Sequence, residues 1–274
     1  MRLFISILLV FVLQVFSYAL DLQKPKTYEK SNEIKGWMMS EKLDGIRAYW
    51  NGKNLISKNA NIIHAPLWFT KDFPNFALDG ELWTKRADFE NIQSIVLDKT
   101  PSKNWEQITY NIFEVPNTKG DFLKRLEKIK TWQKRNKNKY IKVIKQIKCK
   151  DKEHLNNYLE KLVNLKAEGI ILKNPSLEYF TGRSKNILKV KKFKDMEGEV
   201  IGINYKTNEF NKKVFKSLVL KLKNAVVFNL GNGFSKEEKI NHPKIADIVT
   251  FKYYNFTRFG KPKFASFLRV REDE

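Results

Sequence analysis

The sequence is poor in the side chains that most often bind metals or form cross-links. Of its 274 residues, one is cysteine (Cys149) and three are histidine (His64, His154 and His242). A single cysteine excludes a disulfide within the chain, and the scattered histidines lack the close spacing of a zinc site. Nor do these residues suggest a Cys–His catalytic pair. Catalytic candidates must therefore be sought among lysine, carboxylate and aromatic residues.

Acidic residues are few in comparison with basic ones. The chain has 30 Asp+Glu against 52 Lys+Arg, which gives a formal net charge of +22. Such an excess favours a polyanionic partner, most commonly nucleic acid, although a lysine-rich proteome would produce the same excess without one. Hydrophobic residues make up 42% and aromatic residues 13%. This content predicts a globular protein with one large or two modest domains.

Long hydrophobic runs are missing except at the N-terminus. There, Arg2 precedes an apolar run from Leu3 to Phe16, and the small residues Ser17 and Ala19 follow it. This pattern predicts a secretory signal peptide over residues 1–19, cleaved after Ala19. The alternative is an uncleaved anchor, but a membrane span needs about 20 apolar residues and this run is shorter. We therefore expect an exported protein that makes no membrane contact after cleavage.

Periodicity in the middle of the chain predicts a mixture of helices and strands. Apolar residues alternate around Asn51-Gly52, as in a hairpin, and "FALDGELW" is a second candidate strand pair with a turn at Asp79-Gly80. Apolar residues at helical spacing predict amphipathic helices over 121–134 and 151–166. Between them, "YIKVIKQIKCK" predicts a half-buried strand.

The C-terminal part of the sequence has a different hydrophobic pattern. After Lys194, short alternating strands are separated by glycine turns, and Leu218, Leu220 and Leu222 share one face. Five or six short strands in this stretch fit a small β-barrel. The chain is thus expected to be α+β, with a first domain over 20–194 and a barrel over 195–274.

The stretch "SEKLDGIRAYW" contains the first candidate for chemistry. A lysine amine attacks an electrophile only when it is neutral, and burial or nearby cations lower its pKa from about 10.4. Alternation places Lys42 and Asp44 on one strand face, Gly45 allows a close approach, and Arg47 suits a phosphate as a bidentate donor. A solvated surface lysine is the plainer interpretation of Lys42.

Further candidates follow in order along the chain. Glu81 and Glu168 lie on separate predicted strands, and paired carboxylates suit Mg²⁺, which prefers oxygen ligands. Phe113 is an aromatic residue on another strand. Alternation in "ILKVKKFK" places Lys189 and Lys191 on one face, as a phosphate site requires. Each residue alone has a plainer interpretation, as core or solvated surface, but the joint order is harder to obtain by chance.

This order resembles the covalent nucleotidyltransferase superfamily of ATP-dependent DNA ligases, RNA ligases and capping enzymes. "EKLDGIR" resembles the first family motif, and "SKN" the next, with Lys58 where the family has arginine. "LDGEL", "YNIFEV", "EGIILK" and "LKVKK" resemble the motifs that follow. "REDE" resembles the last one, with Arg271 and Asp273 kept and Glu274 in place of lysine. The resemblance implies a nucleotidyltransferase (ATP-grasp-like ligase) adenylation domain followed by a small OB-fold barrel.

The resemblance also implies a role for each matched position. Lys42 is the lysine that becomes adenylated by ATP. Glu81 and Glu168 hold Mg²⁺, with Mn²⁺ as an alternative, and Arg47 and Lys58 contact DNA. The implied ATP-binding residues are Ser40, Glu41, Lys42, Arg47, Glu81, Phe113, Lys173, Lys189, Lys191 and Arg271.

The implied activity is ATP-dependent sealing of nicks with 3′-hydroxyl and 5′-phosphate ends in duplex DNA. The few residues between the predicted cleavage site and Lys42 favour a minimal, periplasm-directed bacterial DNA ligase. We expect a monomer that binds nicked double-stranded DNA and has no stable protein partner. The alternatives are an RNA ligase or capping-type enzyme, and an inactive secreted nucleic-acid-binding protein.

Overall fold

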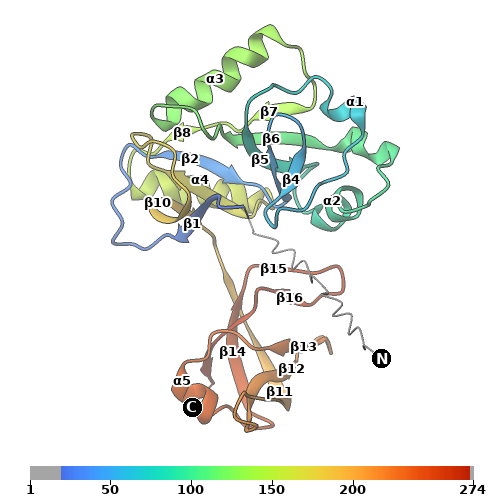
Figure 1. Ribbon diagram of the computed structural model, residues 1–274. Coiled ribbons are helices and arrows are strands. Elements are labelled where there is room, and N and C mark those ends of the chain that lie inside the picture. The colour runs from blue at the N-terminus through green and yellow to red at the C-terminus, as the bar shows by residue number, and fades with distance from the viewer. Residues whose placement is uncertain (1–19, 272–274) are drawn as a thin grey trace, which may run out of the picture. The chain divides into compact units, whose positions relative to one another are not determined.

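The computed structural model describes residues 20–271 and divides into two compact units (Figure 1). The division falls between Lys189 and Val190, a few residues before the expected boundary at 194/195. The predicted signal peptide, and Asp273 and Glu274 of the last motif, lie outside the described residues. No helix within 20–271 is long and apolar enough to cross a membrane.

The first unit contains two five-stranded sheets. The strand order of the first sheet is β1-β10-β9-β2-β8 and that of the second is β4-β3-β5-β6-β7. In the first sheet the strands are β1 (Gln23–Thr27), β2 (Met38–Lys42), β8 (Ile147–Lys148), β9 (Gly169–Lys173) and β10 (Gly182–Val190). In the second they are β3 (Ile46–Trp50), β4 (Leu55–Ser57), β5 (Leu78–Trp83), β6 (Thr109–Glu114) and β7 (Ile141–Val143).

The expected hairpin around Asn51-Gly52 is confirmed as β3 and β4, which pair antiparallel. The expected turn at Asp79-Gly80 is wrong, because β5 continues through both residues, with only a shift in its register against β6 between them. A Cβ on Gly80 would lie 2.6 Å from the carbonyl oxygen of Asn111 on β6. The glycine thus serves close strand packing rather than a turn.

Both predicted helices of the first unit are confirmed. They are α3 (Phe122–Arg135) and α4 (Lys152–Asn164), and each begins after an aspartate, Asp121 or Asp151, whose side chain caps the first turn. The structure adds α1 (Leu67–Thr70), α2 (Phe89–Val96) and a 3₁₀ helix (Lys103–Gln107). The second sheet, α2 and α3 enclose the main core, whose largest buried side chains include Phe69, Leu78, Ile92, Trp105, Tyr110 and Phe122.

The single strand expected between the helices is instead two short ones. β7 is an edge strand of the second sheet, whereas β8 is an edge strand of the first. The segment between them, residues 144–146, therefore passes from one sheet to the other. Alternation predicted the extended backbone but not this change of sheet.

The second unit is predominantly β-structure, as expected. Its five-stranded sheet has the order β13-β12-β11-β14-β17. The predicted apolar face is confirmed, because Leu218, Leu220 and Leu222 are all buried in its core. The elements are β11 (Lys194–Thr207), β12 (Lys213–Lys221), β13 (Val227–Leu230), α5 (Lys236–Ile240), β14 (Ile248–Tyr253), β15 (Asn255–Phe256), β16 (Pro262–Lys263) and β17 (Ser266–Val270).

Candidate active site

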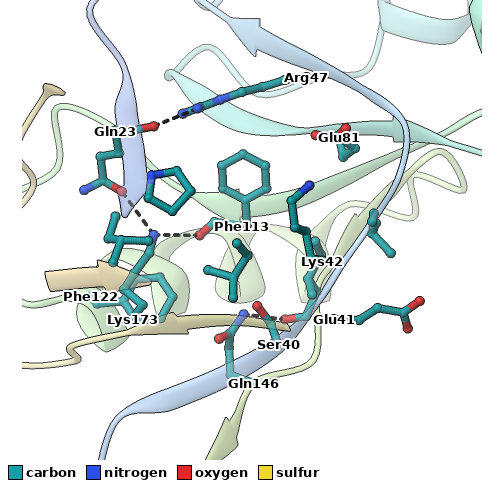
Figure 2. A pocket seen from close by; sticks show the side chains of 15 residues that line it. Gln23, Ser40, Glu41, Lys42, Arg47, Glu81, Phe113, Phe122, Gln146 and Lys173 are labelled. Atoms are coloured by element: carbon teal, nitrogen blue, oxygen red, sulfur yellow. Dashed lines mark hydrogen bonds between the residues drawn. The ribbon is translucent and has the colours of Figure 1, made fainter. Parts of the chain in front are cut away.

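The first unit contains a pocket of about 230 Å³ between its two sheets. Figure 2 shows Phe113 near its centre, with Lys42 and Lys173 on different sides of the ring. The walls combine apolar side chains with several charged ones. The lining residues are Gln23, Pro25, Ser40, Glu41, Lys42, Leu43, Arg47, Glu81, Phe113, Phe122, Ile144, Gln146, Ile171, Lys173 and Ile187.

Lys42 is the last residue of β2 and points into this pocket (Figure 2). It lies opposite Gly169 in the β2–β9 ladder. Its Nζ is 2.5 Å from Oε2 of Glu168, the residue immediately before Gly169. The side chain is three-quarters buried. The amine is therefore held in one place beside a carboxylate, unlike that of a solvated surface lysine.

Gly45 allows the chain to cross from β2 to β3 directly against Glu81. Its backbone N–H donates to Glu81 Oε1 at 3.1 Å. A Cβ at this position would lie 2.3 Å from the carbonyl oxygen of Leu82. A larger residue would displace this crossing, which links Lys42 to the second sheet.

Burial raises the pKa of Glu81 to about 8. The positive charges of Lys42 and Arg47 oppose this shift, while the carboxylate of Glu168 adds to it. Glu81 therefore holds its proton at neutral pH while no cation is bound. The carboxyl groups of Glu81 and Glu168 thus lie close enough to the Lys42 amine and to each other to interact electrostatically. A bound cation would reduce the repulsion between the two carboxylates.

These carboxylates fit a magnesium ion that also contacts phosphate. Mg²⁺ commonly takes one or two protein carboxylates and completes its shell with water and phosphate oxygens. Within residues 20–271 there is no cluster of three or more His, Cys, Asp or Glu side chains that could hold a metal alone. Glu81 and Glu168 thus suit an ion that takes its remaining ligands from water or from a bound phosphate.

Arg47 is fixed above the aromatic ring of Phe113. Its guanidinium donates to both carboxylate oxygens of Asp79, at 2.9 and 2.5 Å, and to the carbonyl oxygen of Gln23 at 2.7 Å. The guanidinium carbon lies 5.3 Å from the centre of the Phe113 ring. Burial raises the pKa of Asp79, and the charge of Arg47 opposes that shift.

Lys173 belongs to a buried charged cluster on another side of the pocket. Its Nζ donates to Glu114 Oε2 at 2.8 Å and to Gln23 Oε1 at 3.1 Å. Arg125 binds both oxygens of Glu114, at 2.8 and 3.0 Å. Burial would raise the pKa of Glu114, but the two cations outweigh burial and hold that pKa below its ordinary value.

Ser40 and Glu41 also line the pocket, but the carboxylate of Glu41 is already bound. Arg86 donates to its two oxygens at 2.8 and 2.7 Å. In Figure 2 this carboxylate points away from the pocket. Glu41 therefore presents its backbone rather than its charge to a ligand.

Of the remaining predicted residues, Lys58 and Lys189 of the first unit do not line the pocket, and Lys191 and Arg271 belong to the second unit. Lys58 is exposed after β4, and Lys189 lies near the end of β10 without lining the pocket. β10 ends at Val190, but the predicted alternation holds across that end, because Leu188 and Val190 are buried whereas Lys189 and Lys191 are partly exposed. Lys191 belongs to the second unit, where its Nζ lies about 5 Å from the rings of Tyr254 and Phe264. In that unit Arg271 donates to Glu197 at 3.1 Å.

Sequence reasoning missed several residues that hold this site together. Arg125 gave a usable signal, because it interrupts the apolar stripe of α3 formed by Phe122, Leu126 and Ile129. A buried arginine on such a stripe indicates a buried acid nearby. The other missed residues gave no comparable local pattern; they are Gln23, Asp79, Arg86, Glu114 and Gln146.

Comparison with known proteins agrees with this architecture. Residues 22–191 match the ATP dependent DNA ligase domain, and residues 208–271 match the DNA ligase OB-like domain. A DNA ligase of Haemophilus influenzae is 38% identical over 270 residues, covering 98% of this chain and 99% of that one. The first of these domains alone spans more than half of the chain.

Solved structures give the same result. A structure from work on Lig E DNA ligases is 38% identical, with a TM-score of 0.87 over 93% of this chain and 100% of that one. A Chlorella virus DNA ligase–adenylate is 22% identical, with a TM-score of 0.56 over 94% of this chain and 100% of that one. The latter likeness concerns the fold alone. Together with the matched domains, these relatives show that the chain belongs to the ATP-dependent DNA ligase family.

Proposed function

We propose that this enzyme seals nicks bearing 3′-hydroxyl and 5′-phosphate ends in duplex DNA through AMP bound covalently to Lys42. The observation that carries the proposal is the position of Lys42 Nζ, inside the pocket and beside Glu168. Phe113 offers a ring for stacking the adenine base, and Arg47 and Lys173 add positive charge to the walls.

The chemistry consists of three transfers at phosphorus. Neutral Lys42 Nζ attacks the α-phosphorus of ATP, so that an N–P bond forms, the bond to the β-phosphate oxygen breaks and pyrophosphate leaves. The 5′-phosphate of the nick then attacks that phosphorus and displaces Lys42. Finally the 3′-hydroxyl oxygen attacks the 5′-phosphorus, loses its proton and expels AMP. Fixed side chains contribute mainly position and charge, as in other phosphoryl transfers.

We assign a divalent cation to Glu81 and Glu168, with Mg²⁺ first and Mn²⁺ as the alternative. The ion would neutralise phosphate charge as the phosphorus is attacked. Glu81 would release its proton on binding the ion, since its pKa is raised to about 8.

The test is formation of the covalent adduct. Incubation with labelled ATP and Mg²⁺, followed by a denaturing gel, should label the wild-type protein, whereas Lys42→Ala and Lys42→Arg should show no label. Lys58→Ala is the matched control, because Lys58 is exposed outside the pocket, and it should remain labelled. A labelled Lys42→Ala protein would refute the assignment.

Alternative activities predict different substrates. A nicked RNA duplex and an RNA 5′ end, offered in competition with nicked DNA, separate a DNA ligase from an RNA ligase or capping-type enzyme. An inactive binding protein would bind DNA but never acquire the label. The OB-like domain match is to that of DNA ligases, which favours DNA.

We also propose that the enzyme is exported to the periplasm. Support comes from the N-terminal pattern, in which Arg2 is followed by an apolar run and by the small residues Ser17 and Ala19. N-terminal sequencing of the protein from a periplasmic fraction should begin at Leu20. Recovery only from the cytoplasm with Met1 retained would contradict export.

A further inference from the structure

Two polar side chains face each other across neighbouring strands in the pocket. In the antiparallel pairing of β2 with β8, Met38 lies opposite Lys148 and Met39 opposite Ile147. One step further, the same register sets Ser40 opposite Gln146, and both residues line the pocket. Figure 2 shows them together at one end of it.

The side-chain amide of Gln146 has only one possible orientation. Its Nε2 donates to the carbonyl oxygen of Ile144 at 3.2 Å. A carbonyl oxygen only accepts hydrogen bonds, so the flipped amide would place two acceptors against each other. The amide oxygen, Oε1, is therefore the atom left available, and within residues 20–271 it receives no hydrogen bond.

Ser40 places a second polar group beside it. The residue is only 4% exposed as a whole and lines the pocket. Its hydroxyl forms no hydrogen bond with another described residue, and it is not one of the fully buried polar atoms that lack a partner, so it keeps some access to the pocket. A hydroxyl in this position can exchange a bond to water for one to a ligand.

The surrounding walls suit a flat aromatic ligand. Phe113, Ile144 and Ile171 line the same pocket, and Ile171 is the neighbour of Ser40 on its other side in the β2–β9 ladder. Ser40 precedes Lys42 by two residues, so both point to one face of β2, about 6.6 Å apart along it. The polar pair thus lies away from the attacking amine, toward the part of the nucleotide that does not react.

We propose that Gln146 determines base specificity by accepting a hydrogen bond from the exocyclic 6-amino group of adenine, with Ser40 bonding to an adjacent ring nitrogen. This inference rests on the proposed use of ATP at Lys42. Guanine carries an oxygen at the same position, which would meet Oε1 as acceptor against acceptor. A pocket with this polar pair therefore accepts ATP and rejects GTP.

The test combines a residue change with a ligand change. Gln146→Leu removes the acceptor at similar size, and purine riboside 5′-triphosphate replaces the 6-amino group of ATP by hydrogen. The measured quantity is the efficiency of covalent adduct formation on Lys42, for ATP, this analogue and GTP. Gln133→Leu is the matched control, since Gln133 also donates from its side chain to a backbone carbonyl, that of Ile141 at 2.9 Å, but does not line the pocket.

We expect the wild-type enzyme to prefer ATP over the analogue roughly ten-fold, as loss of one hydrogen bond predicts, and to use GTP less well still. Gln146→Leu should lower the efficiency of adduct formation with ATP roughly ten-fold and leave the efficiency with the analogue unchanged. Gln133→Leu should leave both efficiencies unchanged. Gln146→Met repeats the test should the leucine variant have a lowered melting temperature.

Two outcomes would overturn the inference. One is an equal loss with ATP and the analogue in both Gln146 variants, and the other is no loss with ATP. An absence of any adduct in the wild-type enzyme would instead refute the Lys42 proposal, so the two failures are distinguishable.

Discussion

At the scale of single residues, Glu81 shows how the pocket changes ordinary chemistry. Its backbone position on β5 places the carboxyl among Lys42, Arg47 and Glu168, away from bulk water. Burial outweighs the two cations and raises the pKa to about 8 from an ordinary value of 4.5. Folding therefore makes this group bind a proton that the unfolded chain would release.

This shift predicts a pH dependence of stability that a single substitution removes. Because the folded pKa lies above the unfolded one, the contribution is complete below pH 4.5 and is lost as pH rises to about 8. The wild-type free energy of unfolding should fall relative to Glu81→Gln across this range, by at most about 1.4 kcal/mol per pH unit because a single proton is released. Urea titrations at several pH values measure the difference.

The control for this prediction is Glu127→Gln on the exposed surface of α3, which should run parallel to wild type at every pH. Parallel curves for wild type and Glu81→Gln would show that the pKa of Glu81 is not raised.

The scale of elements explains why some of the site was predictable and some was not. Lys42, Glu81, Phe113, Glu168 and Lys173 stand in short runs whose spacing is visible in the sequence, and all but Glu168 line the pocket. The helices α3 and α4 were predictable because periodicity and an aspartate cap coincide.

The partners of those residues depend on how elements meet. Gln23 bonds to Lys173 across 150 positions, and Arg47 to Asp79 across 32. No local pattern encodes such pairs. The same limit explains the wrongly predicted turn at Asp79-Gly80. A glycine required for close packing of two strands cannot be distinguished in the sequence from a glycine required for a turn.

Arg125 joins α3 to both sheets and gives a prediction at this scale. It binds Glu114 of β6, which in turn binds Lys173 of β9, and all three are buried. Arg125→Met leaves the carboxylate with Lys173 as its only cationic partner among the described residues and should lower the free energy of unfolding by about 3 kcal/mol. Urea unfolding measures this effect.

The matched control is Arg135→Met, an exposed arginine in the last turn of the same helix, with an expected change of about 0.5 kcal/mol or less. Equal losses in Arg125→Met and Arg135→Met would contradict a structural role for this cluster.

For the whole molecule, the dominant feature is the formal net charge of +22. Cations exceed acids in both compact units, so the attraction for DNA is not confined to one of them. Binding that neutralises about six phosphates should make log K fall with log salt at a slope of roughly −5. Fluorescence anisotropy with nicked duplex DNA between 50 and 200 mM salt (a range of roughly four-fold) measures the slope, and a value near zero would contradict charge-driven binding.

The neighbour of β1 in its sheet is β10, with Gln23 level with Gly182 near the far end of the first unit. Gln23 in turn holds Arg47 through its backbone and Lys173 through its side chain. A chain still being synthesised, or one truncated before Gly182, already contains Lys42 but not the assembled pocket. The pocket is thus completed late in folding, and the proposed adenylation of Lys42 must wait until β10 has paired with β1.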